Sequence, residues 1–358
     1  MNDDAQVPTT GPTNGSGRRP HHARRPVTVG SLLAMLALSL ASGLLVLPQA
    51  QAGPRTATAP RPSATADPAR GAAARAAGHP AARTTRTLPS LTRRDLGRTL
   101  MGKTVYNPTT DWDVAVARDD RFYGRLDTVR VFYPGFPKEW PGPAGRIHRP
   151  VPLSFRIDPS AVLSGRYDAA LRRWFNRAPT KYRIWWTYIH EPEDDITAGR
   201  FTAAAYRAAW RHIYAISRTA GNPKLRPTLT LMCWTLSKNS GRRFSDYYPG
   251  NFIKTFAWDC YNQSWQQGVY KRPAEMFGQA ARFSHRRGKG FAIAEFGSRL
   301  LPGDDGSRRA AWMIRFAKAA AARDAQYVSY FDTLVGGGDF RLRDAPSRRA
   351  WQLVVRKS

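Results

Sequence analysis

Two stretches, Tyr188-Ile189-His190-Glu191-Pro192-Glu193 and Ala292-Ile293-Ala294-Glu295-Phe296-Gly297-Ser298, each place a glutamate at the end of an apolar run. Short apolar runs bounded by polar residues are typical of buried β-strands. In folds built on parallel strands, side chains at the carboxyl ends of the strands gather at one face. The two stretches therefore predict two carboxyl groups that meet at one site.

Similar apolar runs recur on both sides of these stretches, and helical patterns separate many of them. Strands are expected at Thr104–Tyr106, Thr128–Tyr133, Val151–Ile157, Tyr182–Ile189, Thr228–Leu236, Phe252–Trp258, Phe291–Glu295 and Gln326–Phe331. Helices are expected at Tyr167–Asn176, Phe201–Thr219, Pro273–Arg286, Ser307–Ala322 and Ala345–Val355. Eight strands that alternate with helices over about 260 residues predict an α/β fold of the (β/α)8 TIM barrel type. A doubly wound open sheet is the competing fold, because residues 134–150 and 237–251 show no clear helical pattern.

The first quarter of the chain is not expected to join the barrel. Residues 1–52 contain arginines, an apolar run from about Val27 to Leu47 and then Ala50-Gln51-Ala52, which is the pattern of a cleaved secretory signal. The same run approaches the ~20 residues that span a bilayer, so residues 27–47 are alternatively an anchor at the outer face of the membrane. Residues 53–95 are rich in Ala, Pro and Arg and predict a disordered linker, which leaves residues 96–358 as the globular domain.

The chain of 358 residues carries a formal net charge of +30. Residues 1–90 hold 10 of the 56 Lys and Arg and 3 of the 26 Asp and Glu, which leaves 46 against 23 in the remainder. Such a field favours anionic partners, including an anionic cell envelope. Arginine is nevertheless used throughout, and no basic stripe interleaved with aromatic residues emerges, so no specific nucleic acid is expected.

The two cysteines, Cys233 and Cys260, each lie near the end of an apolar run. In an exported protein an even count permits a disulfide, and the ends of neighbouring parallel strands can bring the two Cα atoms within bonding range. Two buried free thiols are the alternative. No Cys/His spacing is typical of a zinc site, and no metal or cofactor is expected.

Glycoside cleavage usually requires two carboxyl groups at one site, and the mouth of a barrel can hold both. One protonates the leaving oxygen, and the other attacks or stabilises the anomeric carbon. Glu191 would end the fourth strand and Glu295 the seventh, so both would face the same opening. In a retaining enzyme the two carboxyl groups lie ~5 Å apart, and in an inverting enzyme they lie ~6.5–9.5 Å apart.

Three motifs point to one family: His190-Glu191, Ala294-Glu295-Phe296-Gly297, and Tyr247-Tyr248-Pro249-Gly250-Asn251 followed by Trp258-Asp259-Cys260-Tyr261. With them, the chain from about Gly102 onward resembles glycoside hydrolase family 26 or a close relative among the retaining (β/α)8 glycosidases. The resemblance implies that Glu191 is the acid/base and Glu295 the nucleophile. It also implies that Tyr261 hydrogen-bonds the nucleophile and that His190 orients the catalytic pair.

The chain departs from the family pattern in two places. Family members commonly follow the acid/base with Met-Asn-Gly, whereas this sequence has Pro192-Glu193-Asp194-Asp195. At the end of the eighth strand Tyr330 and Phe331 stand where many relatives have a tryptophan under the sugar. The family includes enzymes that degrade mannan, mixed-linkage glucan and xylan, and no residue here selects among these substrates.

Four further residues are candidates for the site. Arg130, near the end of the second strand, could hold Glu295 ionised, or it could be one more surface arginine. Trp234 and Trp258 are the expected platforms for sugar rings, because aromatic planes stack on the apolar faces of sugars. Asp158 could bind a sugar hydroxyl, or it could only begin the Asp-Pro-Ser turn.

These features predict a secreted, monomeric, retaining endo-glycosidase that hydrolyses a β-linked polysaccharide such as β-mannan by double displacement. Two alternatives come from other classes. A barrel that has lost activity and binds carbohydrate or cell envelope would account for the altered residues after Glu191. A basic nucleic-acid-binding protein would account for the charge alone, and it predicts salt-sensitive DNA binding that depends on neither glutamate.

Overall fold

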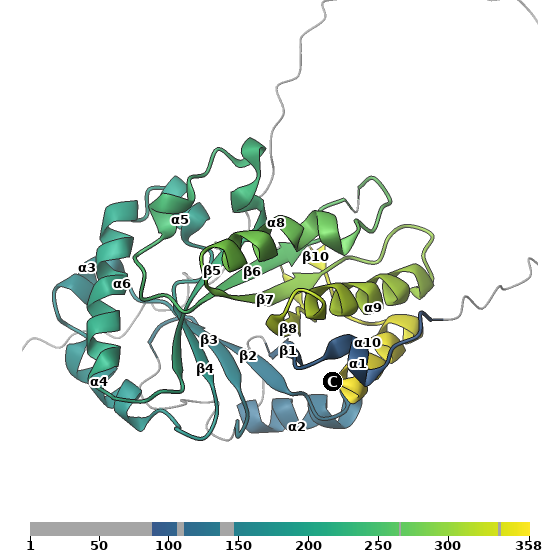
Figure 1. Cartoon of the computed structure of the whole chain (residues 1–358), viewed down its shortest axis with the longest axis horizontal. Coiled ribbons are helices and arrows are strands. Elements are labelled where there is room, and N and C mark those ends of the chain that lie inside the picture. The colour runs from purple at the N-terminus through teal and green to yellow at the C-terminus, as the bar shows by residue number, and fades with distance from the viewer. Residues whose placement is uncertain (1–87, 106–110, 137–146, 265, 336–337) are drawn as a thin grey trace, which may run out of the picture. The chain divides into compact units, whose positions relative to one another are not determined.

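The chain, studied as a computed structural model, folds into a closed barrel over residues 88–105, 111–136, 147–264, 266–335 and 338–358, which are the residues that the structure describes (Figure 1). Eight parallel strands pair in sequence order, and the last pairs with the first. They are β1 (Leu100–Val105), β2 (Thr128–Tyr133), β3 (Val151–Phe155), β4 (Ile184–Tyr188), β5 (Leu225–Met232), β6 (Thr255–Tyr261), β7 (Gly290–Gly297) and β8 (Ala325–Tyr330). Because β8 closes on β1, the predicted (β/α)8 barrel is confirmed and the open sheet is excluded.

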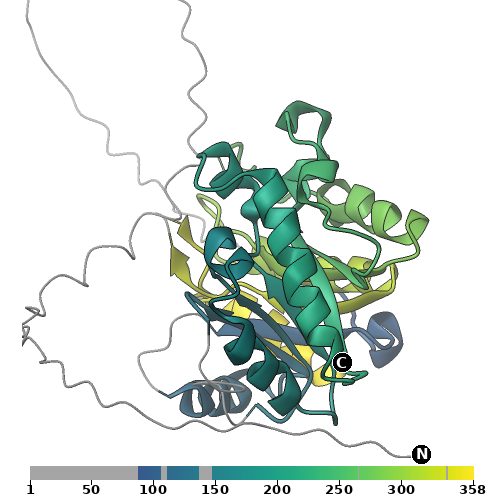
Figure 2. The ribbon, with the colours of Figure 1, turned by 90° about the vertical axis from the view of Figure 1, so that its left-hand side faces the viewer.

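Helices surround this barrel. They are α1 (Arg93–Leu96), α2 (Trp112–Tyr123), α3 (Pro159–Leu163), α4 (Asp168–Arg177), α5 (Pro192–Thr197), α6 (Ala203–Arg218), α7 (Phe244–Tyr247), α8 (Pro273–Arg286), α9 (Ser307–Ala321) and α10 (Ala345–Lys357). The 3-10 helices η2 (Cys233–Leu236) and η3 (Lys238–Ser240) follow β5, and the short pair β9 (Leu334–Val335) and β10 (Gly338–Asp339) follows β8. The long helix α6 packs against α3 and α4 on the outside of the barrel (Figure 2).

Aromatic side chains fill the layer between strands and helices. Trp186 of β4 stacks on Trp210 of α6 with ring centroids 4.9 Å apart, and Phe296 of β7 stacks on Phe316 of α9 at 4.0 Å. Each of these four rings is fully buried. Buried rings contribute more apolar area than any other side chain, so this layer supplies much of the stability of the barrel.

The interior of the barrel is filled differently at its two ends. At the amino-terminal end, Trp185 and Tyr327 pack with three small residues, which are Ala257, Ala292 and Ala294. Gly102 is needed in β1 because a Cβ atom there would lie 2.1 Å from the backbone oxygen of Thr128. Toward the carboxyl-terminal end the inward-facing side chains become polar, and this polar layer carries the candidate site.

Several sequence-based expectations need correction. The strand expected at Thr228–Leu236 ends at Met232, where the chain turns into η2, and the strand expected at Phe252–Trp258 runs instead from Thr255 to Tyr261. No helix was expected between the first two strands, yet α2 forms there. Residues 237–251 carry only η3 and the single turn α7, which agrees with the absence of a helical pattern.

The amino-terminal boundary of the described domain lies earlier than residue 96. Thr92 and Asp95 form a capping box that begins α1, and Leu91 and Leu96 are buried in the core. The predicted signal or anchor at residues 1–52 and most of the predicted linker lie outside the described residues. Among the described residues, no helix combines the length and the apolar composition needed to cross a bilayer.

Candidate active site

The fold brings Glu191 and Glu295 to the carboxyl-terminal end of the barrel. Glu191 follows β4, and its backbone N–H donates to the carbonyl of Thr230 in β5 at 3.1 Å. Glu295 belongs to β7, where it pairs in register with Asp259 of β6. Burial, followed by the charge of Glu295, raises the pKa of Glu191, so the two carboxyl groups lie within electrostatic reach of each other.

The backbone around Glu191 adopts a conformation that the local sequence does not favour. Ile189 has φ 45° and Glu191 has φ 47°, both in the left-handed region. That region is unusual for a β-branched residue such as isoleucine, and strain of this kind persists where the surrounding structure enforces it. The Tyr206 hydroxyl of α6 donates to the Ile189 carbonyl at 3.3 Å, and the Ile189 N–H donates to Phe155 at 2.9 Å. The packing of α6 and β3 therefore fixes the turn that carries Glu191.

Glu295 receives hydrogen bonds at both carboxylate oxygens. The Nε of Arg130 donates to Oε1 at 3.2 Å, and the hydroxyl of Tyr261 donates to Oε2. The Arg130 side chain is fully buried, and its guanidinium lies 4.5 Å from the centroid of the Phe132 ring. A cation at one oxygen and a hydroxyl donor at the other hold the Glu295 carboxylate in a fixed orientation, as a group that attacks an anomeric carbon requires.

Glu191 has the opposite environment. Burial is the main cause of the raised pKa of Glu191, the negative charges of Glu295, Glu193 and Asp194 add to it, and the charge of Arg130 opposes it. No donor group contacts its carboxyl group among the described residues. The carboxyl group therefore stays protonated well above the usual range for glutamate, as a general acid must.

A third carboxyl group, that of Asp259, joins these two glutamates. Its side chain is buried, and neither of its oxygens has a hydrogen-bond partner among the described residues. Burial and the charges of Glu295 and Glu191 raise the pKa of Asp259 well above its usual value. The sequence motif contains Asp259, but the residue was not singled out as a site residue. The signal that could have found it is its alternation with Tyr261, which places both side chains on the inner face.

Hydroxyl groups line the rest of the polar layer. The Oγ1 of Thr104 and the Oγ atoms of Ser154 and Ser329 are buried without partners among the described residues, as are both Nη atoms of Arg130. Strand register places Thr104 directly beside Arg130, on the same inner face. Small polar side chains in place of branched apolar ones leave room for ordered water, which commonly satisfies such groups.

His190 lies against Phe132, with ring centroids 4.9 Å apart. Burial lowers the pKa of His190 well below its usual value, and the charges of Arg130 and Arg156 lower it further. The imidazole is therefore neutral at physiological pH. Within the described structure it makes no hydrogen bond to either glutamate, so its role in orienting the pair stays a prediction.

The two tryptophans expected to bind sugar lie in different places. Trp258 points away from the barrel interior: it is fully buried, and its Nε1 donates to the Ser284 hydroxyl of α8 at 3.1 Å. A ring enclosed beneath a helix cannot stack on a sugar, so the expectation for Trp258 is wrong. Trp234, on η2 after β5, has 48% of its surface exposed, so its role as a platform for a sugar ring stays a prediction.

The structure also decides the roles of Asp158 and of the residues at the end of β8. Asp158 is exposed and caps α3, where its carboxylate accepts from the backbone N–H of Ser160 at 2.8 Å. Of its two alternatives, the turn is therefore the one observed. Phe331 follows β8 and meets the Tyr261 ring edge-on at 5.6 Å, whereas Tyr330 packs outward against Trp351.

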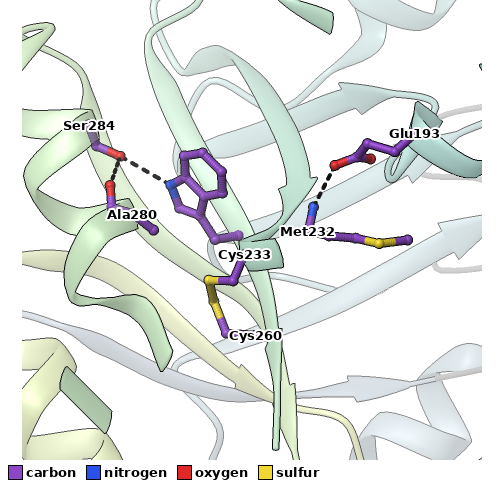
Figure 3. Close-up of a disulfide and its surroundings, with 7 residues drawn as sticks. Glu193, Met232, Cys233, Cys260, Ala280 and Ser284 are labelled. Atoms are coloured by element: carbon purple, nitrogen blue, oxygen red, sulfur yellow. Dashed lines mark hydrogen bonds between the residues drawn. A yellow bond between two sulfur atoms is a disulfide. The ribbon is translucent and has the colours of Figure 1, made fainter. Parts of the chain in front are cut away.

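A disulfide and a buried carboxyl group fix the segment that carries Trp234. Cys233 is bonded to Cys260, with Cα atoms 5.1 Å apart, so η2 is tied to β6 beside Tyr261 (Figure 3). On the other side of η2, Glu193 Oε1 accepts from the Met232 N–H at 2.9 Å and from the Thr235 hydroxyl at 2.5 Å. Burial raises the pKa of Glu193 to about 7. The acidic run Glu193-Asp194-Asp195 gives no indication of this contact in the sequence alone.

No protein-family model and no curated protein matches this sequence. Solved structures are similar to it. An endo-β-1,4-mannanase double mutant from Cellulomonas fimi shares 14% identity over 73% of this chain and 71% of its own, with a TM-score of 0.50. A family 26 β-mannanase from Bacteroides ovatus shares 12% identity over 74% of this chain and 90% of its own, with a TM-score of 0.48.

A 4-O-α-L-rhamnosyl-β-D-glucuronidase from Fusarium oxysporum is also similar, with 11% identity over 72% of this chain and 69% of its own, and a TM-score of 0.48. The first two of these proteins are named as β-mannanases, and the third is named for a different activity. At such identities the likeness concerns the fold. The fold itself is given by the strand order: β8 closes on β1, and the chain has the fold of a (β/α)8 barrel.

Proposed function

We propose that the chain is a retaining β-glycosidase of the family 26 type, with Glu295 as nucleophile and Glu191 as general acid and base. The observation that carries the proposal is the contrast between the two carboxyl groups. Glu295 accepts hydrogen bonds from a buried arginine and a tyrosine, whereas the carboxyl group of Glu191 meets no donor among the described residues and has a raised pKa. A carboxylate held by two donors beside a carboxyl group with a raised pKa is an arrangement that suits acid/base-assisted glycoside cleavage.

In the first step, Glu295 attacks the anomeric carbon while Glu191 gives its proton to the glycosidic oxygen. The bond from carbon to the leaving oxygen breaks, the leaving sugar departs as an alcohol, and an ester joins the remaining sugar to Glu295. Forming the ester removes the negative charge that helps to raise the pKa of Glu191. Glu191, now ionised and with a lower pKa, takes a proton from water, and that water cleaves the ester with retention at the anomeric carbon.

Substrate binding is proposed to involve Trp234, which is the exposed aromatic side chain on η2. An endo-acting β-mannanase is the specific form of the proposal to test first, since the Cellulomonas fimi protein of similar fold is an endo-β-1,4-mannanase. The export signal predicted at residues 1–52 would place this activity outside the cell.

A glycan panel tests the proposal. Full-length protein is incubated with β-mannan, mixed-linkage β-glucan and xylan, and reducing ends are measured over time. Glu191→Gln and Glu295→Gln are compared with Glu275→Gln, a matched control on the exposed face of α8 whose carboxylate pairs with Arg272. We expect one polysaccharide to be cut by the wild type and the control, and a loss of at least about a hundredfold in both site variants. Equal product release by wild type and Glu191→Gln would overturn the assignment of the acid.

A further inference from the structure

The amino-terminal face of the barrel, opposite the candidate site, has an uneven distribution of charge. It is formed by the segments that lead into the strands, which are residues 97–99, 124–127, 147–150, 178–183, 219–224, 248–254, 287–289 and 322–324. In these described residues there are 10 Lys or Arg and 2 Asp, the latter being Asp127 and Asp324. The cations are Arg98, Arg125, Arg149, Lys181, Arg183, Lys224, Lys254, Arg287, Lys289 and Arg323.

Cations on this face rarely meet an acidic partner. Of the ten, only Arg149 forms an ion pair within the described residues, with Asp120 at 2.7 Å. At the opposite end of the barrel arginines are paired repeatedly, for example Arg242 with Asp194 at 2.5 Å and Arg341 with Asp339 at 2.8 Å. The basic composition is therefore largely balanced around the candidate site and unbalanced on the opposite face.

Helix dipoles do not account for these charges. Cations in the last turn of a helix are favourable, and Arg177, Arg218 and Arg286 occupy such positions. Lys181 and Arg183, in contrast, lie four and six residues beyond the end of α4, outside the turn where the dipole acts. Lys254 lies close enough to Lys289 for its charge, after burial, to lower the pKa of that lysine. Like charges held together by a fold are compensated when an anion binds.

We propose that this basic face binds a linear anionic polysaccharide. We define the basic face by its six exposed cations, which are Arg98, Arg125, Lys181, Arg183, Lys254 and Arg287. They are contributed by five different segments that lead into strands of a closed ring, so a polymer with one anion per repeat can meet several of them at once. Binding at this end leaves the mouth with Glu191 and Glu295 facing away from the bound polymer.

The chemistry of the face favours this partner over two others. None of the exposed large apolar side chains of the described residues belongs to the eight segments, so the face lacks the apolar anchors that stabilise docking on a membrane. For the same reason it has no exposed aromatic platform on which unpaired nucleotide bases could stack. Apart from Arg287, whose guanidinium lies 3.6 Å from the centroid of the Phe283 ring, no contact with an aromatic ring is found for these six cations in the described part of the chain. Exposed cations of this kind suit a hydrated, evenly charged polymer, and such contacts weaken as salt is added.

The test uses full-length protein and fluorescently labelled polygalacturonate, an α-linked polyanion that the proposed β-glycosidase site does not cut. Binding is measured by anisotropy at two salt concentrations. One variant neutralises four cations of the basic face: Arg125→Gln, Lys181→Gln, Arg183→Gln and Lys254→Gln. A matched control neutralises four exposed cations elsewhere: Arg172→Gln, Arg173→Gln, Lys271→Gln and Arg349→Gln.

At about 50 mM salt we expect the first variant to lose at least about tenfold in affinity and the control less than about threefold, with wild-type binding abolished near 500 mM. Similar losses in both variants would show that diffuse charge, and not this face, binds the polymer. Tighter wild-type binding to duplex DNA, or to phosphatidylglycerol vesicles, at the same salt would show that the partner is wrong. Hydrolysis of a soluble oligosaccharide by the first variant should be unchanged, which separates this proposal from that of the active site.

Discussion

Replacing Arg130 by methionine tests how the site holds its negative charges. Arg130 is fully buried, and its Nε lies 3.2 Å from Glu295 Oε1. Glu295 and Asp259 are the first two negative charges that stabilise the charged arginine. Methionine keeps the apolar stem of the side chain and removes the cation, so the carboxylate of Glu295 is left buried with Tyr261 as its remaining donor.

The size of the effect follows from the geometry. Two unit charges 3.2 Å apart attract each other by about 5 kcal/mol at an effective dielectric constant of about 20. The desolvation of both groups offsets part of this attraction, and removing one partner of a buried pair typically costs 3–5 kcal/mol, because the other charge stays buried. We therefore expect Arg130→Met to lower the free energy of unfolding by about 3–5 kcal/mol at pH 7.

The assay is urea unfolding of wild type, Arg130→Met, Glu295→Gln and the double variant, with the disulfide intact. The double variant should be more stable than the sum of the two single effects predicts, with a coupling energy above about 1.5 kcal/mol. Arg172→Met, at an exposed position of α4, controls for the loss of an arginine and should change stability by less than about 0.5 kcal/mol. Additive effects, or a loss below about 1 kcal/mol in Arg130→Met, would refute the reasoning.

Three further predictions concern acid catalysis and the segment around η2. Glu191→Gln should lower kcat by about 10²–10⁴-fold. It should also remove the alkaline limb of the pH profile of kcat, because wild-type activity is lost as pH rises through the raised pKa of Glu191. An alkaline limb that persists in the variant would argue against this role. Replacing Cys233 and Cys260 by serine should lower the free energy of unfolding by about 3.5 kcal/mol, because the disulfide closes a loop with a sequence separation of 27 and so restricts the unfolded chain. A loss below about 1 kcal/mol, measured by urea unfolding, would contradict this expectation. Burial raises the pKa of Glu193 to about 7, so its contribution to stability is present below its unfolded pKa and is lost as pH rises through 7. Between pH 4 and pH 8 the wild type should therefore lose about 3 kcal/mol of stability relative to Glu193→Gln, and parallel pH profiles of the two proteins would contradict the buried environment.

The sequence was sufficient for the barrel and for its paired glutamates. Buried parallel strands are continuous apolar runs, and such runs place Glu191 and Glu295 after the fourth and within the seventh strand. The register then determines which side chains share the interior. The contact of Arg130 with Glu295 joins residues 165 positions apart. The place of Arg130 near the end of the second strand made it a candidate partner of Glu295, but no local pattern could decide between that contact and a position at the surface.

The error at Trp258 has a physical cause. The expected strand ended at Trp258, and the next residue in the sequence is an acid, Asp259. In the fold Asp259 is buried inside the barrel and the strand continues to Tyr261. Since side chains alternate along a strand, inward positions at 259 and 261 send Trp258 outward, against α8. Where the interior of a barrel is polar, a hydrophobic pattern therefore ends before the strand does.

The helix α2 was missed for a related reason. Its buried face includes Asp119 along with Trp112, Val116 and Tyr123, so the apolar stripe is interrupted by an acid. In the fold that acid accepts a hydrogen bond from Lys103 of β1 at 2.8 Å, which compensates its burial. A pairing between a strand and the following helix appears only when the two elements are packed together.

Covalent trapping tests the central claim most directly. The polysaccharide identified by the glycan panel defines the sugar, and the matching 2-fluoro glycoside with a good leaving group slows the second step so that the ester accumulates. Mass spectrometry of the digested protein should then find the fluorosugar on the peptide that contains Glu295, and Glu191→Gln should still be labelled, because a good leaving group needs no proton. A label on any other residue, or hydrolysis with inversion and no label, would contradict the account.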